Sequence, residues 1–219
     1  MDWQAARVSA LLALCTAALL LPIGLLMARW LASTHSRAKP LWEALLMLPL
    51  LLPPTVIGFY LLAGFGANSA VGSWLATHLN LRLVFSFEGL LAASLLINLP
   101  FMVQPMQRAL EAVPQSLREA AWVSGLSPWR CFAKIELPLA WGGVVSGVAL
   151  TAAHTLGEFG VVLMVGGSIP GETKTLSIAI YDRVQAFDEA NAHVMAGALL
   201  ACSLAALVGV FASSKPVKR

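Results

Sequence analysis

Stretches without charged side chains set the strongest limit on how this chain can fold. A helix that crosses a membrane needs about 20 consecutive, mostly apolar residues. Val8 to Ala28 contains no charged residue, and Arg29 follows it directly. Four more stretches have similar character, and the five predicted spans are residues 8–28, 41–63, 89–107, 139–157 and 191–213. The sequence therefore predicts an all-α integral membrane protein with five spans.

The composition supports this assignment. The chain has 219 residues, of which 58% are hydrophobic and 11% are charged, whereas soluble domains carry roughly 25% charged residues. A chain of this length forms one compact unit, so we expect a single transmembrane domain over residues 1–219. The net charge is +3, and no basic block points to nucleic acid. Cys15, Cys131 and Cys202 lack metal-ligand spacing, so we expect no metal site.

Lysine and arginine give the orientation, because cytoplasmic loops carry an excess of them. Five spans put the termini on opposite sides, and the positive residues divide 10 to 4. The ten are Arg29, Arg37, Lys39, Arg108, Arg118, Arg130, Lys134, Lys215, Lys218 and Arg219, and the four are Arg7, Arg82, Lys174 and Arg183. We therefore expect the N-terminus outside and the C-terminus inside. Asp2 precedes the first apolar stretch, an order that favours a retained helix over a cleaved signal peptide.

The connection before the fifth span contains a helical pattern. Within residues 175–187, the apolar residues Leu176, Ile180, Val184 and Phe187 recur at helical spacing. The charged residues of this stretch lie at other positions of the helical pattern. We expect an amphipathic helix near the outer surface, with these four side chains on its apolar face.

A polar segment, residues 109–138, joins the third and fourth spans on the expected cytoplasmic side. Pro114 suits the first turn of a helix, and Gly125 suits a left-handed C-terminal cap. Ser127-Pro128 then starts a second short helix as N-cap and first residue. We expect a helix, a tight turn and a second helix, with Leu137-Pro138 turning the chain back into the membrane.

The first of these two short helices can offer a surface to a partner. One face carries Leu117, Ala121 and Ser124, and Ala120 lies beside them. Small side chains let another surface approach closely, and Arg118 and Glu119 can form ion pairs at the rim. The alternative is an ordinary amphipathic interfacial hairpin, because amphipathic helices at the membrane interface are common.

The same segment carries a spaced motif. Glu119-Ala120-Ala121 is followed after three residues by Gly125, and after nine more by Ile135-Glu136-Leu137-Pro138. This pattern resembles the EAA loop of ABC-importer permeases, the loop that docks onto a cytoplasmic ATPase. The resemblance implies that the ATPase-coupling residues are Arg118, Glu119, Ala120, Ala121, Ser124, Gly125, Leu126 and Pro128.

Other segments resemble molybdate permeases, a group within these importers. These segments are Leu52–Tyr60, Leu99–Val103, Leu156–Gly160 and Gly167–Leu176. With them, the resemblance extends from about Val8 to Ala212. The Gly-Glu-Phe-Gly element at Gly157 also occurs in sulfate permeases, so a sulfate or tungstate permease is the alternative. His154 departs from the pattern, since relatives more often carry arginine near this position.

The resemblance implies a five-span type I ABC-importer permease that carries molybdate across the cytoplasmic (inner) membrane of a prokaryote. Two copies would form a homodimer in the membrane lipid, two ABC ATPase subunits would bind the cytoplasmic loops, and an extracytoplasmic binding protein would deliver molybdate. ATP and Mg would be bound by the ATPases. We expect no cofactor in this chain, which has no phosphate-binding Gly-Lys-Ser/Thr loop and therefore no ATPase site of its own.

Enzymes and other membrane proteins are the competing classes. The sequence contains neither His-Glu-x-x-His nor Gly-x-Ser-x-Gly, so it indicates neither an intramembrane metalloprotease nor a serine hydrolase, and we expect no catalytic residues. A membrane scaffold or a stand-alone channel would not need an ATPase-docking loop.

Helix-breaking and polar residues within the spans are candidates for the translocation pathway. Pro53 and Pro54 free backbone groups, which is tolerated only beside protein or a water-filled cavity. Together with Thr55 they are expected to approach the pathway, and a simple kink in a packed helix is the alternative. Asn98 is a further candidate and is expected to form a hydrogen bond between helices.

His154 and Glu158 complete the set of pathway candidates. They lie four residues apart on one helix face, and ionisable groups at membrane depth are functional candidates. A carboxylate would repel an anion, so we interpret Glu158 as structural, bound to a helix terminus or to a donor on a neighbouring helix. In the same span, Gly142, Gly143 and Gly147 are expected to allow close helix packing.

Overall fold

The structure is a computed structural model, and it describes residues 1–213. This part of the chain is helical and contains no strand. The elements, in order, are α1 (Trp3–Ser33), α2 (Lys39–Leu51), α3 (Pro54–Phe65), α4 (Ala70–Leu79), α5 (Phe87–Glu111), α6 (Gln115–Val123), α7 (Pro128–Cys131), the π-helix η1 (Phe132–Glu136), α8 (Leu137–Leu139), α9 (Trp141–Gly157), α10 (Gly160–Gly166), α11 (Leu176–Gln185) and α12 (Glu189–Ser213).

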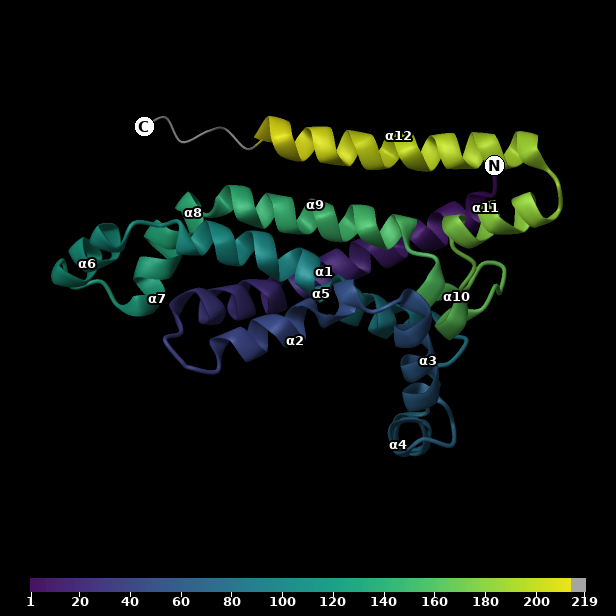
Figure 1. Ribbon diagram of the computed structural model, residues 1–219, viewed down its shortest axis with the longest axis horizontal. Helices are drawn as coiled ribbons and strands as arrows, with labels where there is room; N and C mark the ends of the chain where they lie inside the picture. The colour runs from purple at the N-terminus through teal and green to yellow at the C-terminus, as the bar shows by residue number, and fades with distance from the viewer. Residues whose placement is uncertain (214–219) are drawn as a thin grey trace.

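The long helices α1, α5, α9 and α12 run along the longest axis of the molecule (Figure 1). Three helices, α1, α5 and α12, are long and apolar enough to cross a membrane, and two bent helix pairs raise the number to five if each pair is one span. The predicted spans 8–28 and 89–107 lie inside α1 and α5, and span 191–213 lies inside α12. The all-α class predicted from the sequence is therefore confirmed for the described residues.

The predicted span 41–63 is not one straight helix. Helices α2 and α3 meet at an angle of 103°. Leu52 between them has an extended backbone, with ψ of 141°. Proline disfavours helical geometry in the residue before it and donates no backbone hydrogen bond, so Pro53 and Pro54 end α2 and start α3 in a new direction. Helices α3 and α4 consequently project sideways from the bundle (Figure 1).

A second bend precedes α9. The run from α7 through η1 to α8 is continuous and meets α9 at 71°. The chain turns at Ala140, so the prediction that it turns at Leu137-Pro138 is wrong. The Leu137 N–H bonds to the Phe132 carbonyl five residues back, which widens the helix just before Pro138. This π-turn accommodates the proline without ending the helix.

The core lies where α1, α5 and α9 pack together. Leu20, Met102, Met106 and Val144 are among the side chains buried there. An added Cβ at Gly143 or Gly147 would collide with the α5 backbone at Pro105 or Met102, whereas at Gly142 it would meet nothing within 4 Å. The predicted packing role is therefore confirmed for Gly143 and Gly147 and wrong for Gly142.

Helix α11 forms where the amphipathic pattern predicts one, but its buried face differs from the predicted face. Leu176, Ile178 and Ala179 are buried, whereas Val184 and Phe187 are 56% and 90% exposed. Leu176 and Ala179 pack with buried residues of α1 and α12. The positions of α1 and α12 thus determine which side of α11 is covered, and spacing within α11 cannot reveal that.

Asp188 precedes α12 at this end of the molecule. Its carboxylate accepts hydrogen bonds from the Asn191 side chain, at 2.9 and 3.1 Å, and from the Asn191 backbone N–H. These bonds, together with Arg183, hold the pKa of the Asp188 carboxyl below its ordinary value. An ionised carboxylate suits the N-terminus of a helix.

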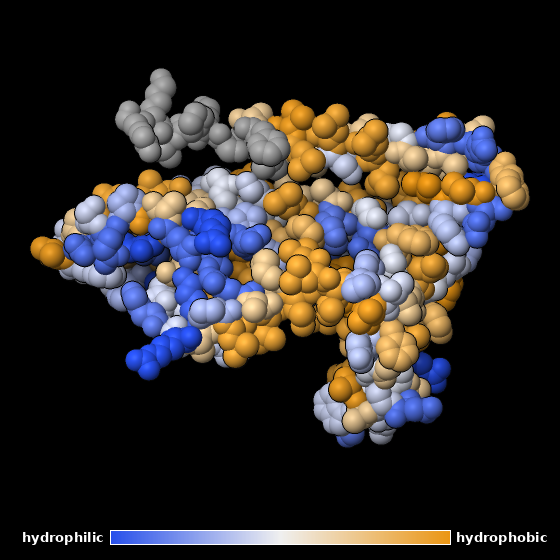
Figure 2. Space-filling view, viewed as in Figure 1, coloured by the Kyte–Doolittle hydropathy of each residue, from blue (hydrophilic) through white to orange (hydrophobic). Residues whose placement is uncertain are grey.

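The surface matches a membrane environment. Apolar side chains cover the middle of the molecule and polar side chains gather toward its ends (Figure 2). Large apolar residues on the long helices are widely exposed, including Leu14 and Leu200, each 70% exposed. So large an exposed apolar surface is unfavourable in water, and the acyl chains of lipid would cover it.

Candidate functional site

Residues 114–139, which we call the polar hairpin, form one end of the molecule (Figure 1). The cap residues act as the sequence predicts. Gly125 has a left-handed backbone with φ of 80°. Its N–H bonds to the Trp122 carbonyl at 2.9 Å, and the Leu126 N–H bonds to the Ala121 carbonyl at 3.0 Å. Ser127 accepts a hydrogen bond from the Arg130 N–H at 3.4 Å, so it caps α7.

Most of the motif residues lie on the surface of the polar hairpin. Glu119, Ala120, Ser124 and Gly125 are exposed, while Ala121 is buried. Val123, which the motif does not include, is 90% exposed, and its neighbour Trp122 is 48% exposed. One side of α6 therefore presents small, acidic and apolar side chains to solvent in the described chain.

Arg118 is turned inward, although the sequence predicts it at the rim. Its Nε lies 3.0 Å from Glu136 Oε1, and both side chains are mostly buried. Its Nη2 donates to the Leu110 carbonyl at 2.7 Å. Arg118 therefore ties α6 to η1 and to the end of α5, and it serves the internal structure of the polar hairpin.

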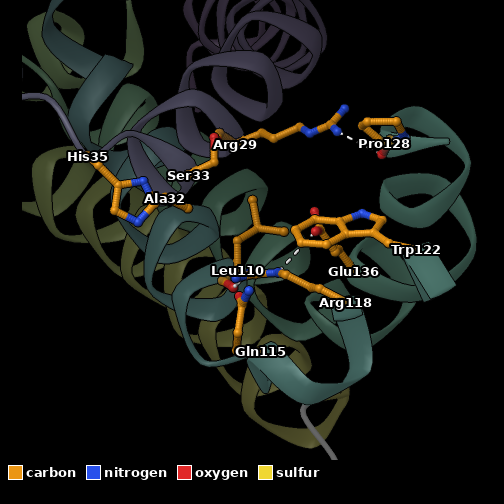
Figure 3. A pocket seen from close by; sticks show the side chains of 10 residues that line it. All are labelled: Arg29, Ala32, Ser33, His35, Leu110, Gln115, Arg118, Trp122, Pro128 and Glu136. Atoms are coloured by element: carbon orange, nitrogen blue, oxygen red, sulfur yellow. Dashed lines mark hydrogen bonds and ion pairs between the residues drawn. The ribbon is translucent and has the colours of Figure 1, made fainter. Parts of the chain in front are cut away.

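A cavity of about 370 Å³ separates the polar hairpin from the ends of α1 and α5. Figure 3 shows its lining side chains, which come from all three parts of the chain. They include Arg29, Ser33, His35, Gln115, Arg118 and Glu136. Beside this cavity the polar hairpin also packs directly on the bundle, because its Phe132 is buried with residues of α1 and α5.

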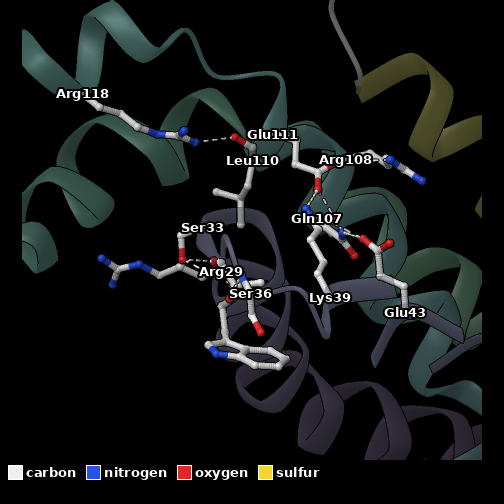
Figure 4. A network of polar contacts seen from close by, with 12 residues as sticks. Arg29, Ser33, Ser36, Lys39, Glu43, Gln107, Arg108, Leu110, Glu111 and Arg118 are labelled. Atoms are coloured by element: carbon white, nitrogen blue, oxygen red, sulfur yellow. Dashed lines mark hydrogen bonds and ion pairs between the residues drawn. The ribbon is translucent and has the colours of Figure 1, made fainter. Parts of the chain in front are cut away.

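A network of polar side chains fixes α2 to α5 beside this cavity (Figure 4). Lys39 Nζ lies 2.9 Å from Glu111 Oε1, and Arg108 lies 3.2 Å from the other oxygen of Glu111. Gln107 donates to Glu43 at 2.6 Å and to Glu111 at 3.0 Å. These contacts join the start of α2 to the last turns of α5, the helix that precedes the polar hairpin.

The second candidate region is a chain of buried and partly buried polar side chains that crosses the bundle. Thr16 of α1 donates to Ser94 of α5 at 3.0 Å, and the Asn98 amide donates to the Ser94 carbonyl and hydroxyl at 2.9 and 3.2 Å. A ring nitrogen of His154 on α9 lies 3.0 Å from Asn98 Oδ1. The other lies 3.8 Å from Glu158 Oε2. Asn98 therefore joins two helices, as its sequence position predicts.

Glu158 occupies the break between α9 and α10. Its Oε1 accepts a hydrogen bond from the Val161 N–H at 3.0 Å, in the first turn of α10. Ser177 donates to the Glu158 carbonyl at 2.6 Å. Phe101 stacks on the His154 ring with centroids 4.1 Å apart. The contacts of Glu158 agree with its structural interpretation, because the carboxylate satisfies a free helix N-terminus.

The pathway candidates are only partly brought together. Pro54, His154 and Glu158 line a cavity of about 130 Å³ at the α2–α3 bend, and Asn98 adjoins it through His154. Pro53 and Thr55 are exposed and do not line this cavity. Among the described residues, no group of three or more His, Cys, Asp and Glu side chains is arranged to hold a metal ion.

Comparison with known sequences gives consistent results. The family model for the binding-protein-dependent transport system inner membrane component matches residues 21–214. The chain is 43% identical over 215 residues to the molybdenum transport system permease protein ModB of Azotobacter vinelandii, covering 98% of this chain and 95% of that protein. It is 35% identical to the ModB of Escherichia coli K12, covering 84% of this chain and 80% of the relative. The sulfate transport system permease protein CysT of the same organism is 35% identical, with 85% and 67% covered.

Solved structures share the fold. A bacterial ABC transporter involved in the import of the acidic polysaccharide alginate superposes with a TM-score of 0.75 at 14% identity, covering 97% of this chain and 79% of that chain. The same kind of transporter in complex with an alginate pentasaccharide-bound periplasmic protein gives a TM-score of 0.72 at 16% identity, with 95% and 75% covered.

Proposed function

The chain belongs to the family of inner membrane components of binding-protein-dependent transport systems, and on that basis we propose that it is the transmembrane subunit of an ATP-driven molybdate importer. The observation that carries this proposal is the 43% identity to a molybdenum permease over 98% of the chain. The protein is a multi-pass protein of the cytoplasmic membrane.

Molybdate is favoured over sulfate by similarity and by length. The chain covers 95% of the Azotobacter molybdenum permease but only 67% of the Escherichia coli sulfate permease, with 43% and 35% identity. A sulfate or tungstate permease is the second candidate, because molybdenum and sulfate permeases both resemble this chain over most of its length.

The proposed complex has five polypeptides. Two copies of this chain form the pathway, two ABC ATPase subunits bind ATP and Mg, and an extracytoplasmic binding protein delivers the anion. The structural relative solved with a periplasmic protein supports the last of these partners. The chain itself needs no cofactor and hydrolyses no ATP in this scheme.

The polar hairpin is the proposed contact with the ATPase. Its exposed residues Glu119, Ala120, Ser124 and Gly125 form the docking surface, with Leu126 and Pro128 beside them. Ala121 and Arg118 support that surface from within, since Ala121 is buried and Arg118 pairs with Glu136. A rigid, capped hairpin can pass movement of the ATPase to the bundle.

We count each bent helix pair as one span, which gives five spans with the N-terminus outside and the C-terminus inside. The 10-to-4 division of positive residues supports this orientation. It places the polar hairpin on the cytoplasmic side, where an ATPase is available. Pro53, Pro54, Thr55, Asn98, His154 and Glu158 remain candidates for the pathway near the α2–α3 bend.

Substrate competition tests the proposed anion. Vesicles that contain this chain, its ATPase and the cognate binding protein are supplied with labelled molybdate and an excess of unlabelled sulfate or tungstate. We expect tungstate to block uptake and sulfate to leave it unchanged, because molybdate and tungstate are close in size and charge. Uptake of sulfate without uptake of molybdate would move the chain to the sulfate permeases.

A further inference from the structure

Arg29 links the first long helix to the polar hairpin. It lies four residues before the end of α1, and its Nη2 donates to the Pro128 carbonyl at 2.8 Å. Its guanidinium carbon lies 4.2 Å from the ring centroid of Trp129 and 4.3 Å from that of Phe132. One side chain of α1 therefore contacts three residues on the first turns of α7 and η1, about 100 positions away in the sequence.

The chemistry of arginine suits this position. A planar guanidinium can donate hydrogen bonds in its plane while its faces lie against aromatic rings. Lysine would supply a charge and a donor but no flat surface. The contacts of Arg29 with a carbonyl and with two rings use both properties, so the identity of the residue matters as well as its charge.

The contact of Arg29 lies beside a cavity and next to the packed core, where Phe132 is buried with residues of α1 and α5. The cavity of about 370 Å³ lies between the end of α1 and the polar hairpin, and Arg29 and Arg118 both reach its edge. Arg118 connects the α6 half of the hairpin to α5 through the Leu110 carbonyl. Arg29 connects the α7 half to α1 through Pro128. The two halves are joined by the ion pair between Arg118 and Glu136.

Helix α1 can carry a displacement to the far end of the bundle. It is a continuous helix of 31 residues. Its Thr16 joins the buried polar chain through Ser94, and its Ser9 accepts a hydrogen bond from the Leu176 N–H at 2.7 Å, at the start of α11. Helix α1 therefore has direct contacts with α7, with the polar chain and with the start of α11.

We propose that Arg29 is a positioning residue for transport, which holds the α7 half of the polar hairpin and transmits its movement to α1. This inference rests on the proposed function, because it assigns a role within ATP-driven import. It adds a coupling residue that lies outside the spaced motif and on another helix.

The test measures the number of molybdate ions imported per ATP hydrolysed by the complete complex in vesicles. Arg29→Met removes both the hydrogen bond and the cation, and we expect the ratio to fall by roughly threefold to tenfold, which corresponds to about 0.7–1.4 kcal/mol, the range of an ordinary hydrogen bond at an exposed position. Arg29→Lys should give an intermediate ratio. Arg37→Met is the matched control, because Arg37 is an exposed cation in the loop after α1, and its ratio should equal that of the wild type.

Trp129→Leu provides a second and independent test, because it removes a ring that Arg29 contacts and leaves the cation in place. We expect this variant to lower the ratio by itself and to add little in the Arg29→Met background, since contacting residues are not additive. An unchanged ratio in Arg29→Met, or in Trp129→Leu if Arg29→Met does not assemble, would overturn the inference. Failure of the proposed function would be visible separately, as a wild-type complex that imports no molybdate.

Discussion

Replacing Gly125 with valine should uncouple the polar hairpin from transport. The backbone of Gly125 has φ of 80°, and a Cβ added there would meet nothing within 4 Å. The cost of Gly125→Val is therefore backbone strain and not collision. A β-branched residue in the left-handed region costs about 1–3 kcal/mol. At about 2 kcal/mol the equilibrium between the closed and opened turn shifts by about 30-fold.

Opening this turn would remove the fixed backbone connection between α6 and α7. The hydrogen bonds from the Gly125 and Leu126 N–H groups to the Trp122 and Ala121 carbonyls depend on the left-handed residue. Without them, α6 is a helix of nine residues, which is too short to be stable alone in water. We expect the hairpin to lose its fixed shape while the long apolar helices still insert.

The assay compares uptake of labelled molybdate, retention of the ATPase on the purified chain, and the amount of chain in the membrane. Gly125→Val should reduce uptake at least tenfold at normal membrane levels. Gly125→Asn should retain most of the activity, because asparagine tolerates the left-handed region. Gly142→Val is the matched control, since a Cβ at Gly142 also meets nothing within 4 Å and its backbone is helical. Normal uptake by Gly125→Val, or an equal loss in Gly142→Val, would refute the reasoning.

Three other predictions concern the ion pair, the helix break and the topology. Arg118→Met should lower the thermal stability of the protein by about 1–3 kcal/mol because it leaves Glu136 unpaired, and adding Glu136→Leu should restore part of the loss; equal stability of the single variant and the wild type would contradict the pairing. Glu158→Ala should lower the stability of the protein by about 1 kcal/mol through loss of the cap on α10. Glu158→Gln keeps a hydrogen-bond acceptor and should retain both stability and uptake. Loss of uptake in Glu158→Gln without loss of stability would instead assign the charge of Glu158 a role in transport. A single cysteine at Asp2, in a chain without its three native cysteines, should react with a membrane-impermeant reagent in intact cells, and reaction only after lysis would reverse the orientation.

The sequence predicts those parts of the fold that depend on local chemistry. The apolar stretches give α1, α5 and α12, because a span requires only length and hydropathy. The turn at Gly125 and the cap at Ser127 are also predicted correctly, since each depends on one residue type and its neighbours. These features need no knowledge of what lies across the bundle.

Features that depend on direction or on distant contacts are not predicted. The sequence marks Pro53 and Pro54 as helix breakers, but hydropathy cannot give the 103° angle between α2 and α3. The sequence also predicts that the chain turns back to the membrane at Leu137-Pro138, whereas in the structure it turns at Ala140. The π-turn that accommodates Pro138 has no recognisable sequence signal.

The site shows the same division between local and distant information. The motif identifies the exposed surface of α6, but it does not reveal that Arg118 turns inward to Glu136. Arg29 is interpreted from the sequence only as a positive charge that closes a span. Its partners are Pro128, Trp129 and Phe132, and no spacing rule connects residues about 100 positions apart.

Accumulation of molybdate against its gradient tests the central claim most directly. Vesicles contain this chain and its ATPase, with ATP on the ATPase side and the loaded binding protein on the other, and the plateau concentration of labelled molybdate is measured on both sides. We expect accumulation above the supplied concentration, with ATP hydrolysis required. Equilibration to the supplied concentration with or without ATP would contradict it and would indicate a channel instead of an ATP-driven importer.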